Sequence, residues 1–405
     1  MSASQKPPQA AVRLALRLAW RNLGRNRRRS AISVAAVAFA LFFAVVMRSL
    51  QLGVYGHMIE TLVGNVLGYT EVAAEGYWPL QSLDAALPEN PEWLAAVEAD
   101  DQVGKAAPRV AGFAWLSGAK GGSAAQLVGI DAAREKRGVG DGPPGSIWLG
   151  PGLARQLGVS VGDSVVGLGQ GYQGSLANGG FVVAGEVTVG NPELEKRLAV
   201  VSLPDAQQFY GAYGLWTSVV LSPNDPVNHR AVAARLPQEH PLEGAVWRTW
   251  EERMPELDQA IRADSTGGLV VLSVLYVVIG FGLLGTMLML AEERKREFSM
   301  QIALGVSRRL LAATVFLEAT FLAALGALVG GGAGRLVVEI MHVYPLRLRG
   351  ELAEAIVRQG WAPILPPSMD PSIVVTHALL IWLLAVLVAL WPVRAVFNAP
   401  TVFRG

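Results

Sequence analysis

The chain has 405 residues, of which 52% are hydrophobic and only 17% are charged, and its formal net charge is +1. This composition lies between those of soluble globular proteins and of proteins made only of membrane helices, so a mixed architecture is expected. The chain contains no cysteine, which excludes disulfides, thiolate metal sites and thiol nucleophiles.

The first 30 residues form a basic segment that we expect in the cytoplasm. They contain one lysine, seven arginines and no acid, and such an excess of positive charge marks the cytoplasmic flanks of membrane helices. Arg13, Arg17, Arg21 and Arg25 recur every four residues with apolar residues between them. This spacing predicts an amphipathic helix on the inner leaflet whose arginines meet lipid phosphate. A basic anchor that only sets orientation is the alternative.

Four long apolar runs predict four transmembrane helices, because each can cross a bilayer core of about 30 Å as a helix of roughly 20 residues. Starting from a cytoplasmic N-terminus, four spans place both chain ends in the cytoplasm. The predicted order is a cytoplasmic segment 1–30, a first span 31–52, an extracytoplasmic domain 53–266, a second span 267–290, a cytoplasmic segment 291–309, a third span 310–335, an extracytoplasmic loop 336–371, a fourth span 372–393 and a cytoplasmic tail 394–405.

Small residues in the first two spans predict a contact between two chains. Ala36, Ala40 and Ala44 form a stripe at spacing four in the first span, and Gly280 and Gly285 lie in the second. Small side chains let helix backbones approach closely, which adds van der Waals packing that lipid does not supply. We therefore expect these five residues where two copies of the chain, or two related chains, meet.

The long segment between the first and second spans, residues 53–266, is predicted to fold as an α+β domain outside the membrane. It alternates short strand-like runs with helix signals, and residues 51–266 hold 25 acidic against 14 basic residues. The stretch 167–180 has six glycines among its 14 residues and predicts a projecting hairpin loop. Thr249 followed by Glu252 predicts a capping box that opens a helix toward the second span.

No pattern in the sequence predicts catalysis or a metal site. The residues Gly158–Gly162 fit G-x-S-x-G, but the predicted order around them is helix then strand, the reverse of a nucleophile elbow. The five histidines are scattered, with no H-E-x-x-H motif. No Walker A sequence occurs, so no P-loop ATPase is expected in this chain.

The segment 291–309 is a short charged stretch between the second and third spans, and we expect it to act as a cytoplasmic lever. It contains five basic and three acidic residues and is too short to fold alone. A cytoplasmic partner is expected to receive it, with the apolar Phe298, Ile302 and Leu304 as anchors and the charges setting orientation.

The third span carries two features of its own. Gly326, Gly330 and Gly334 make two overlapping G-x-x-x-G steps, which serve either packing within the chain or contact with a partner subunit. Glu318 is an acid inside the span, which is costly unless it is paired or protonated. A structural, neutral or hydrogen-bonded glutamate is favoured over a proton relay, because His377 is the only visible intramembrane partner.

Several stretches resemble the FtsX-like (type VII) permeases of bacterial ABC transporters, of the macrolide-exporter and lipoprotein-releasing type. In the lever, residues 293–298 and the triplet 303–305 are similar to the family's coupling segment E-R-x-x-E-[IF]-G…A-L-G, and Glu318 stands where its third-span glutamate is usual. The tail residues 391–394 and 399–404 resemble the family's Y-P-A-x…P-x-x-A-L-R ending. Parts of the 53–266 domain are similar to the outer domain of the lipoprotein-releasing branch.

The resemblance implies mechanotransmission. Two permease chains, identical or related, would work with two separate ABC ATPase subunits, whose nucleotide-driven closure moves the levers and thereby the outer domains. ATP and magnesium would bind to those subunits, so this chain needs no cofactor and no catalytic residue. The ATPase-coupling residues implied in this way are Glu293, Arg294, Glu297, Phe298, Ile302, Ala303, Leu304 and Gly305.

The resemblance also implies a place and a cargo. The expected location is the bacterial inner membrane, and the expected task is the release or export of lipoprotein or lipid there. Membrane lipid and a periplasmic carrier or lipoprotein are the further expected partners, and nucleic acid is not. A membrane-anchored regulator of a periplasmic or cell-wall enzyme, driven by the same ATPase, is the alternative, and a signalling scaffold without an ATPase is a third.

Overall fold

The computed structural model describes residues 8–25, 27–78, 80–135, 139, 142–358 and 363–397, and the predicted tail motif at 399–404 lies outside them. The chain divides into two compact units. The helical unit comprises Met1–Tyr55, Ile261–Leu346 and Leu365–Gly405, and the sheet unit comprises Gly56–Ala260 and Arg347–Ile364.

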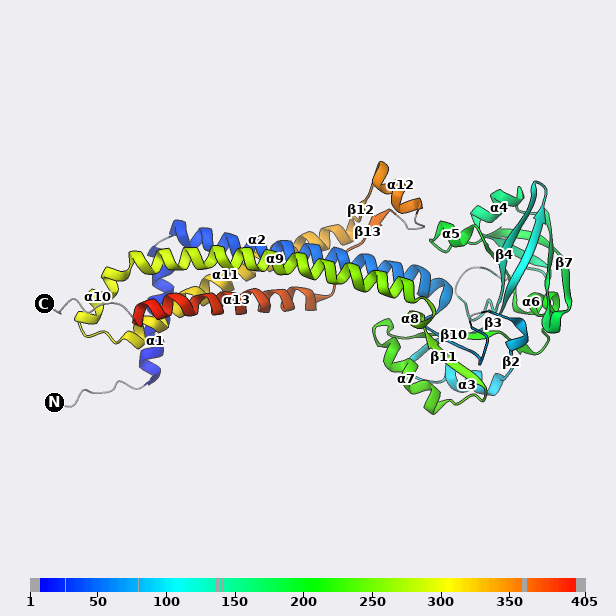
Figure 1. The fold of residues 1–405 in the computed structure, drawn as a ribbon, viewed down its shortest axis with the longest axis horizontal. Coiled ribbons are helices and arrows are strands. Elements are labelled where there is room, and N and C mark those ends of the chain that lie inside the picture. Colours follow the sequence, from blue (N-terminus) through cyan, green and yellow to red (C-terminus); the bar gives the residue numbers. More distant parts are fainter. Residues whose placement is uncertain are drawn as a thin grey trace. The chain divides into compact units, whose positions relative to one another are not determined.

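Four helices of the described residues are long and apolar enough to cross a membrane, as the hydropathy pattern predicted. These candidate spans are Ser30–Gly64, Pro255–Met289, Arg308–Val343 and Pro371–Arg394. The corresponding helices are α2 (Arg27–Ile59), α9 (Pro255–Glu293), α11 (Arg308–Val343) and α13 (Pro371–Phe397), and two shorter helices are α1 (Pro8–Arg25) and α10 (Lys295–Ala303) (Figure 1). The helices are longer than the predicted spans, because hydropathy detects only their apolar part and not the polar turns that continue it.

The glycine stripe of α11 packs inside the chain, against α2. A Cβ atom at Gly330 would lie 2.2 Å from the carbonyl oxygen of Ala38, so only glycine allows the two backbones to come this close. Cβ atoms at Gly326 and Gly334 would lie 2.6 Å and 3.1 Å from the Cβ atoms of Val37 and Val45 in α2. Of the two roles left open for this stripe, the structure assigns packing within the chain.

The small residues predicted to join two chains divide into two groups. Ala40 and Ala44 are completely buried within the protomer, and Gly280 is buried against α13. These three residues already have neighbours in their own chain, so placing them at a contact between chains was wrong. Ala36 is exposed, and a Cβ atom at Gly285 would meet nothing within 4 Å. A small side chain permits close approach but does not say which helix approaches.

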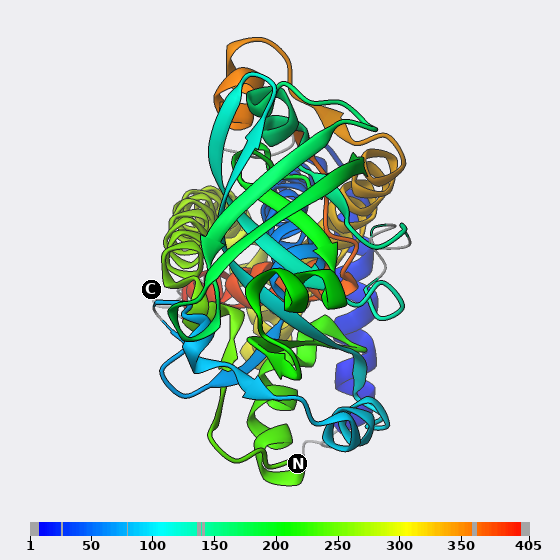
Figure 2. The ribbon, with the colours of Figure 1, turned by 90° about the vertical axis from the view of Figure 1, so that its right-hand side faces the viewer.

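The sheet unit is an α+β fold, as predicted, built on a nine-stranded sheet of order β11-β1-β10-β3-β4-β8-β5-β7-β6. Its strands are β1 (Thr70–Ala74), β3 (Val103–Gly118), β4 (Gly121–Ile130), β5 (Ser146–Leu149), β6 (Ser164–Gln170), β7 (Leu176–Glu186), β8 (Leu198–Ser202), β10 (Ser218–Pro223) and β11 (Ala245–Thr249). Strand β3 also pairs with β6, so six strands from β3 to β6 close into a barrel (Figure 2). The long β3 takes part in both the barrel and the open part of the sheet.

Beside its hydrophobic cores, the sheet unit contains several short helices. They are α3 (Pro91–Glu98), α4 (Pro151–Leu157), α5 (Pro192–Glu195), α6 (Leu203–Tyr210), α7 (His229–Glu239), α8 (Trp250–Arg253) and α12 (Glu351–Arg358), beside the short strands β2 (Leu87–Pro88), β9 (Leu215–Trp216), β12 (Leu346–Arg347) and β13 (Ile364–Leu365). One core fills the barrel around the fully buried Tyr210. The second includes Trp93 of α3 and Leu236 of α7.

The glycine-rich stretch 167–180 forms a hairpin, but most of it is paired strand and not a projecting loop. Strands β6 and β7 pair from Ser164 to Gln170, and only residues 171–175 connect them. A Cβ atom at Gly167 or Gly179 would come within 3.1 or 3.2 Å of the Phe209 ring. These two glycines therefore make room for an aromatic side chain of the core, a use that the sequence pattern does not distinguish from flexibility.

The predicted capping box at Thr249 and Glu252 is present, but the helix that it opens is short. Helix α8 ends at Arg253, Met254 has non-helical angles (φ −127°, ψ 62°), and α9 begins at Pro255. The residue before a proline is pushed out of the helical region. Pro255 therefore separates the capped turn from the long helix.

Candidate functional site: the lever between α9 and α11

The predicted lever folds as the short helix α10 with a glycine turn after it. The N–H of Gly305 donates to the carbonyl oxygen of Ile302 over 3.0 Å, and Gly305 has a positive φ of 93° that favours glycine. Ser307 then caps α11 by accepting a hydrogen bond from the N–H of Leu310. The lever is thus joined to α11 by an ordered turn.

A buried ion pair holds the lever to the third span. Arg294 Nη1 lies 2.7 Å from Glu318 Oε2, and each side chain is only 7% exposed. Asn22 of α1 donates a further hydrogen bond to the same carboxylate oxygen over 3.3 Å. The expectation of a hydrogen-bonded glutamate fits this arrangement, but the partner is Arg294 and not His377. His377 Nδ1 lies instead 2.7 Å from the hydroxyl of Tyr276.

A second ion pair links the lever to the N-terminal helix α1. Arg25 Nη2 lies 2.7 Å from Glu297 Oε2, with side-chain exposures of 53% and 43%. A pair this exposed contributes at most about 1 kcal/mol. Packing supports the link more strongly, because Ala15 and Ala19 are buried and Trp20 meets Phe321 of α11 edge to face at 5.8 Å.

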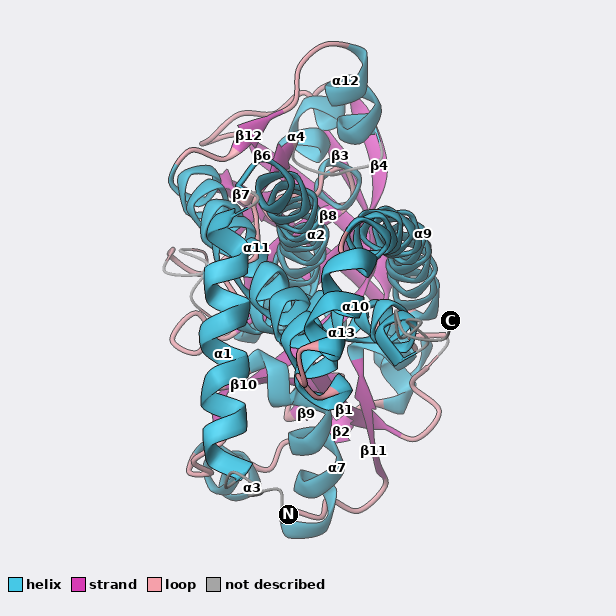
Figure 3. Cartoon of the chain, turned by 90° about the vertical axis from the view of Figure 1, so that its left-hand side faces the viewer, coloured by secondary structure: helices cyan, strands magenta, loops and turns pink. Residues whose placement is uncertain are grey.

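Figure 3 views α1 and α10 from the end of the helical unit where they lie. On α1 the two alanines face inward, while Arg13, Arg17 and Arg21 are exposed. This is the amphipathic division that the sequence predicted.

The lever has one face that packs on α11. Phe298 is 7% exposed and packs against Leu311, with the half-buried Ile302 beside them. Phe298 therefore has little surface left for a partner, whereas Ile302 is only half-buried, and the role of these two residues as partner anchors stays a prediction. Residues four apart lie on one face of a helix, and this apolar face is used to fix the lever to its own chain.

The opposite side of the lever is open. Leu304 is 80% exposed and Met300 is 59% exposed, and Glu293, Ala303 and Gly305 are exposed as well. The predicted coupling residues thus divide into a group that anchors the lever and a group that is accessible. Met300 was missed because the resemblance draws attention to the charged motif, and the exposure that makes this methionine a candidate binding residue is visible only in the structure.

The barrel of the sheet unit exposes a second apolar surface, which we call the apolar sheet face. In the sheet register Trp115 lies opposite Leu168, and the neighbouring rows add residues from β6 and β7 on the same side. Large apolar patches on soluble surfaces mark sites of interaction. The face consists of Phe113 (61% exposed), Trp115 (51%), Val166 (53%), Leu168 (46%), Leu176 (75%) and Val182 (51%).

Three side chains at the edge of the sheet unit come close enough together to suggest a metal site. The ligand atoms of Asp100, Glu239 and His240 all lie within 4.8 Å of one another. However, Arg235 Nη2 lies 2.7 Å from Asp100 Oδ1 and the same guanidinium also pairs with Glu239. The positive charge that these carboxylates attract is thus supplied by the protein itself, and the cluster is an ion-pair network.

This network makes a pH prediction. Its hydrogen bond from Arg235 lowers the pKa of Asp100 from 3.8 to about 2, against the opposing effect of burial. A carboxylate with a depressed pKa stabilises the fold above its unfolded pKa and loses that contribution as the pH falls through its folded pKa. Between pH 5 and pH 2, denaturant unfolding followed by tryptophan fluorescence should therefore show a larger loss of stability for the wild type than for Asp100→Asn. Equal pH dependence would contradict the assignment.

Comparison with known proteins identifies the helical unit most clearly. Residues 269–401 match the model described as FtsX-like permease C-terminal. The lipoprotein-releasing system transmembrane protein LolC of Neisseria meningitidis serogroup B is 25% identical over 330 residues, which cover 76% of this chain and 76% of LolC. The macrolide export ATP-binding/permease protein MacB of Rhodopirellula baltica is 29% identical over 115 residues, covering 28% of this chain and 16% of MacB.

Two solved extracytoplasmic domains are also similar to this chain. The extracellular domain of the ABC-type transporter YknZ from Gram-positive bacteria has 14% sequence identity and a TM-score of 0.30, and the match covers 44% of this chain and 98% of that domain. The periplasmic region of MacB from Actinobacillus actinomycetemcomitans has 12% identity and a TM-score of 0.32, with 50% and 95% covered.

Proposed function

Because the chain belongs to the FtsX-like permeases of ABC transporters, we propose that it transmits the motion of a separate ATPase to its extracytoplasmic unit. The observation that carries this proposal is the lever itself. Its inward face is fixed to α11 by the Arg294–Glu318 pair and by Phe298, and its outward face presents Met300 and Leu304. An apolar anchor surrounded by charges is the kind of surface that a protein partner buries.

The fixed inward face explains how a push on the lever becomes a movement of a helix. If the segment were a loose loop, force applied at Leu304 would bend it locally. The buried ion pair and the packed Phe298 instead oblige α10 and α11 to move together, because buried packed contacts do not deform continuously. Since α11 packs on α2 through Gly330, the movement passes on to the first span.

The partner ATPase supplies ATP, magnesium and hydrolysis in this scheme. We propose two ATPase subunits and two permease chains, identical or related, arranged around a common axis in the bacterial inner membrane, with both chain ends in the cytoplasm. Among the small residues predicted at the contact between two permease chains, Ala36 and Gly285 are exposed, and this exposure supports their place in that contact.

We propose that the cargo is a lipoprotein or a similar amphiphile, released at the extracytoplasmic side. The name of the LolC relative supports this class of cargo, and so does the apolar sheet face, on which an acylated protein or its carrier can bury hydrophobic surface. The spans offer little polar lining, because Glu318 is paired with Arg294 and His377 with Tyr276. The cargo therefore need not cross between the helices.

The test of the proposed function is co-purification of the ATPase. Leu304→Glu combined with Met300→Glu should lower the amount of ATPase retained by at least about tenfold, because a buried apolar anchor contributes 2 kcal/mol or more. Leu80→Glu is the matched control, since Leu80 is equally exposed, at 81%, but belongs to the sheet unit. Full retention in the double variant would contradict docking at the lever.

The cargo proposal has a separate test in the sheet unit. A photo-crosslinking residue at Leu176 of the apolar sheet face should capture an acylated protein or its carrier, whereas one at Val161, which is 67% exposed in a turn outside that face, should not. Mass spectrometry of the captured material identifies it. Capture only from positions within the spans would overturn this part of the proposal.

A further inference from the structure

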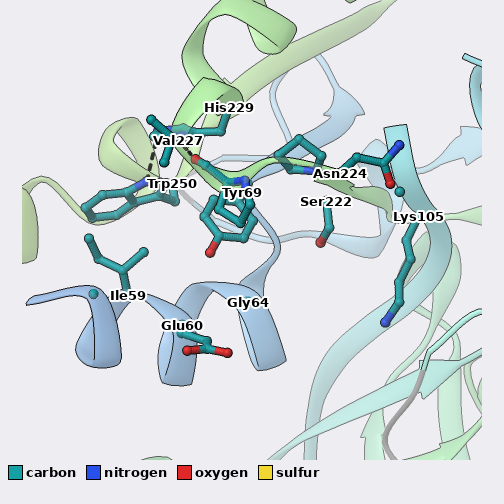
Figure 4. Close-up of a pocket in the computed structure, with 14 residues that line it drawn as sticks. Ile59, Glu60, Gly64, Tyr69, Lys105, Ser222, Asn224, Val227, His229 and Trp250 are labelled. Atoms are coloured by element: carbon teal, nitrogen blue, oxygen red, sulfur yellow. Dashed lines mark hydrogen bonds between the residues drawn. The ribbon is translucent and has the colours of Figure 1, made fainter. Parts of the chain in front are cut away.

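A cavity of about 800 Å³ lies within the sheet unit, at a place that the transmission mechanism does not use (Figure 4). Small-molecule sites in proteins typically measure roughly 300 to 1,000 Å³. Its lining comes from the end of α2 and the segment that follows it, from the residue before β1, from β3, from the segment between β10 and the start of α7, and from α8. The lining residues used below are Ile59, Glu60, Gly64, Tyr69, Lys105, Val227, His229 and Trp250.

One wall of the cavity is aromatic and is held in place by hydrogen bonds. The rings of Tyr69 and His229 lie 5.6 Å apart, and those of His229 and Trp250 lie 6.4 Å apart. Both nitrogens of His229 are engaged, since Nδ1 lies 2.8 Å from the carbonyl oxygen of Pro226 and Nε2 lies 2.8 Å from Glu251 Oε1. The wall is therefore formed before any ligand arrives.

The facing wall is a π-helix, Glu60–Leu67, that directly follows α2. Such helices are rare and are frequent at functional sites. Gly64, within it, lies beside the Tyr69 hydroxyl, since a Cβ atom there would be at an ordinary contact distance of 3.8 Å from that oxygen. The π-helix ends at Gly68, where φ is 74° and a Cβ atom would lie 1.8 Å from a Val220 methyl group. This wall depends on glycine at its end.

The cavity presents two opposite charges without an ion-pair partner among the residues that the structure describes. Glu60 and Lys105 both line it, and Figure 4 shows the carboxylate and the amine as separate groups. Burial, with a smaller effect of the Glu60 charge, raises the pKa of Tyr69, so its hydroxyl stays a hydrogen-bond donor. Apolar surface from Ile59 and from Val227, which is 85% exposed, adjoins these polar groups.

We infer that this cavity binds the headgroup of a zwitterionic phospholipid that carries a primary ammonium and a phosphate. Lys105 binds the phosphate, Glu60 binds the ammonium, and Ile59 and Val227 contact the apolar part next to the headgroup. A phospholipid fits better than a soluble zwitterion, because Ile59 and the exposed Val227 present apolar surface beside the two charges. This site is independent of ATPase docking.

Lipid binding to the detergent-purified full-length protein, measured by native mass spectrometry, tests the inference. The probes are dioleoyl phosphatidylethanolamine, dioleoyl phosphatidylglycerol and soluble phosphoethanolamine. Lys105→Ala and Glu60→Gln should each weaken phosphatidylethanolamine binding by about tenfold, the effect of losing one charge-assisted hydrogen bond. Lys120→Ala and Glu92→Gln are the controls, because both residues are exposed and neither lines the cavity. Unchanged melting temperatures will show that all four variants fold.

The outcomes separate the possible sources of the ligand. Preference for phosphatidylethanolamine over phosphatidylglycerol, lost in both cavity variants and kept in both controls, is the expected result. Equal binding of the two lipids, unaffected by the cavity variants, would mean annular lipid only and would overturn the site. Binding of soluble phosphoethanolamine as tight as that of the lipid would overturn the assignment to a phospholipid.

Discussion

Replacing Glu318 with leucine should cost the protein about 3 to 5 kcal/mol of stability, the usual result of removing one member of a buried ion pair. The reason is that Arg294, 6% exposed, would keep its charge in the interior without a counter-charge. Its Nε and Nη2 already lack a hydrogen-bond partner, so no other described group is positioned to compensate. Thermal unfolding in detergent measures the loss.

The double variant Arg294→Met with Glu318→Leu is the decisive comparison for this pair. It removes both charges and keeps similar volumes, so it should recover most of the stability lost in the single variant. The exposed pair Lys295–Glu292, 3.0 Å apart with exposures of 49% and 75%, supplies the control. Lys295→Met should change stability by less than about 1 kcal/mol. A single variant Glu318→Leu as stable as the wild type would show that the pair does not anchor the lever.

Replacing Gly330 with valine should be about as damaging. A Cβ atom there would lie 2.2 Å from the carbonyl oxygen of Ala38 and 2.7 Å from its Cα, and these backbone atoms can only move if α2 and α11 separate. A cost of about 3 kcal/mol, at the upper end for overpacked sites, is expected. The loss should appear as a lower melting temperature and a lower yield of folded protein.

Gly332, two residues further along the same helix, is the matched control for this prediction. It is exposed, and a Cβ atom there would meet nothing within 4 Å. Gly332→Val introduces the same side chain into the same helix and should leave the melting temperature nearly unchanged. Similar losses in both variants would mean that helix propensity, and not the contact between α2 and α11, sets the importance of these glycines.

The spans were predictable because the hydropathy of a helix is a property of its own sequence. An apolar run long enough to cross a bilayer is visible in the sequence whatever it packs against. The contacts between helices were not predictable, since they depend on which residues face each other. Ala40 and Gly330 are both small, and only their positions on α2 and α11 show that they pack inside one chain.

The lever illustrates the same limit at the candidate site. The motif located the segment correctly. Phe298 and Leu304 are both apolar, however, and which of them is buried depends on which face of α10 packs on α11. Likewise an acid within a span requires a partner, but the sequence does not show that this partner is Arg294, which lies outside the apolar run. Contacts distant in sequence were the part that required the structure.

Crosslinking from the lever is the measurement that tests transmission most directly. Because the chain has no cysteine, Leu304→Cys creates a unique thiol on its exposed face, and Leu80→Cys creates an equally accessible one in the sheet unit. With a thiol-reactive crosslinker in intact membranes, we expect Leu304→Cys to capture a protein with a Walker A sequence and Leu80→Cys not to capture it. Capture of that ATPase by Leu80→Cys, or no capture by Leu304→Cys in a complex that still hydrolyses ATP, would show that the ATPase does not dock on the lever.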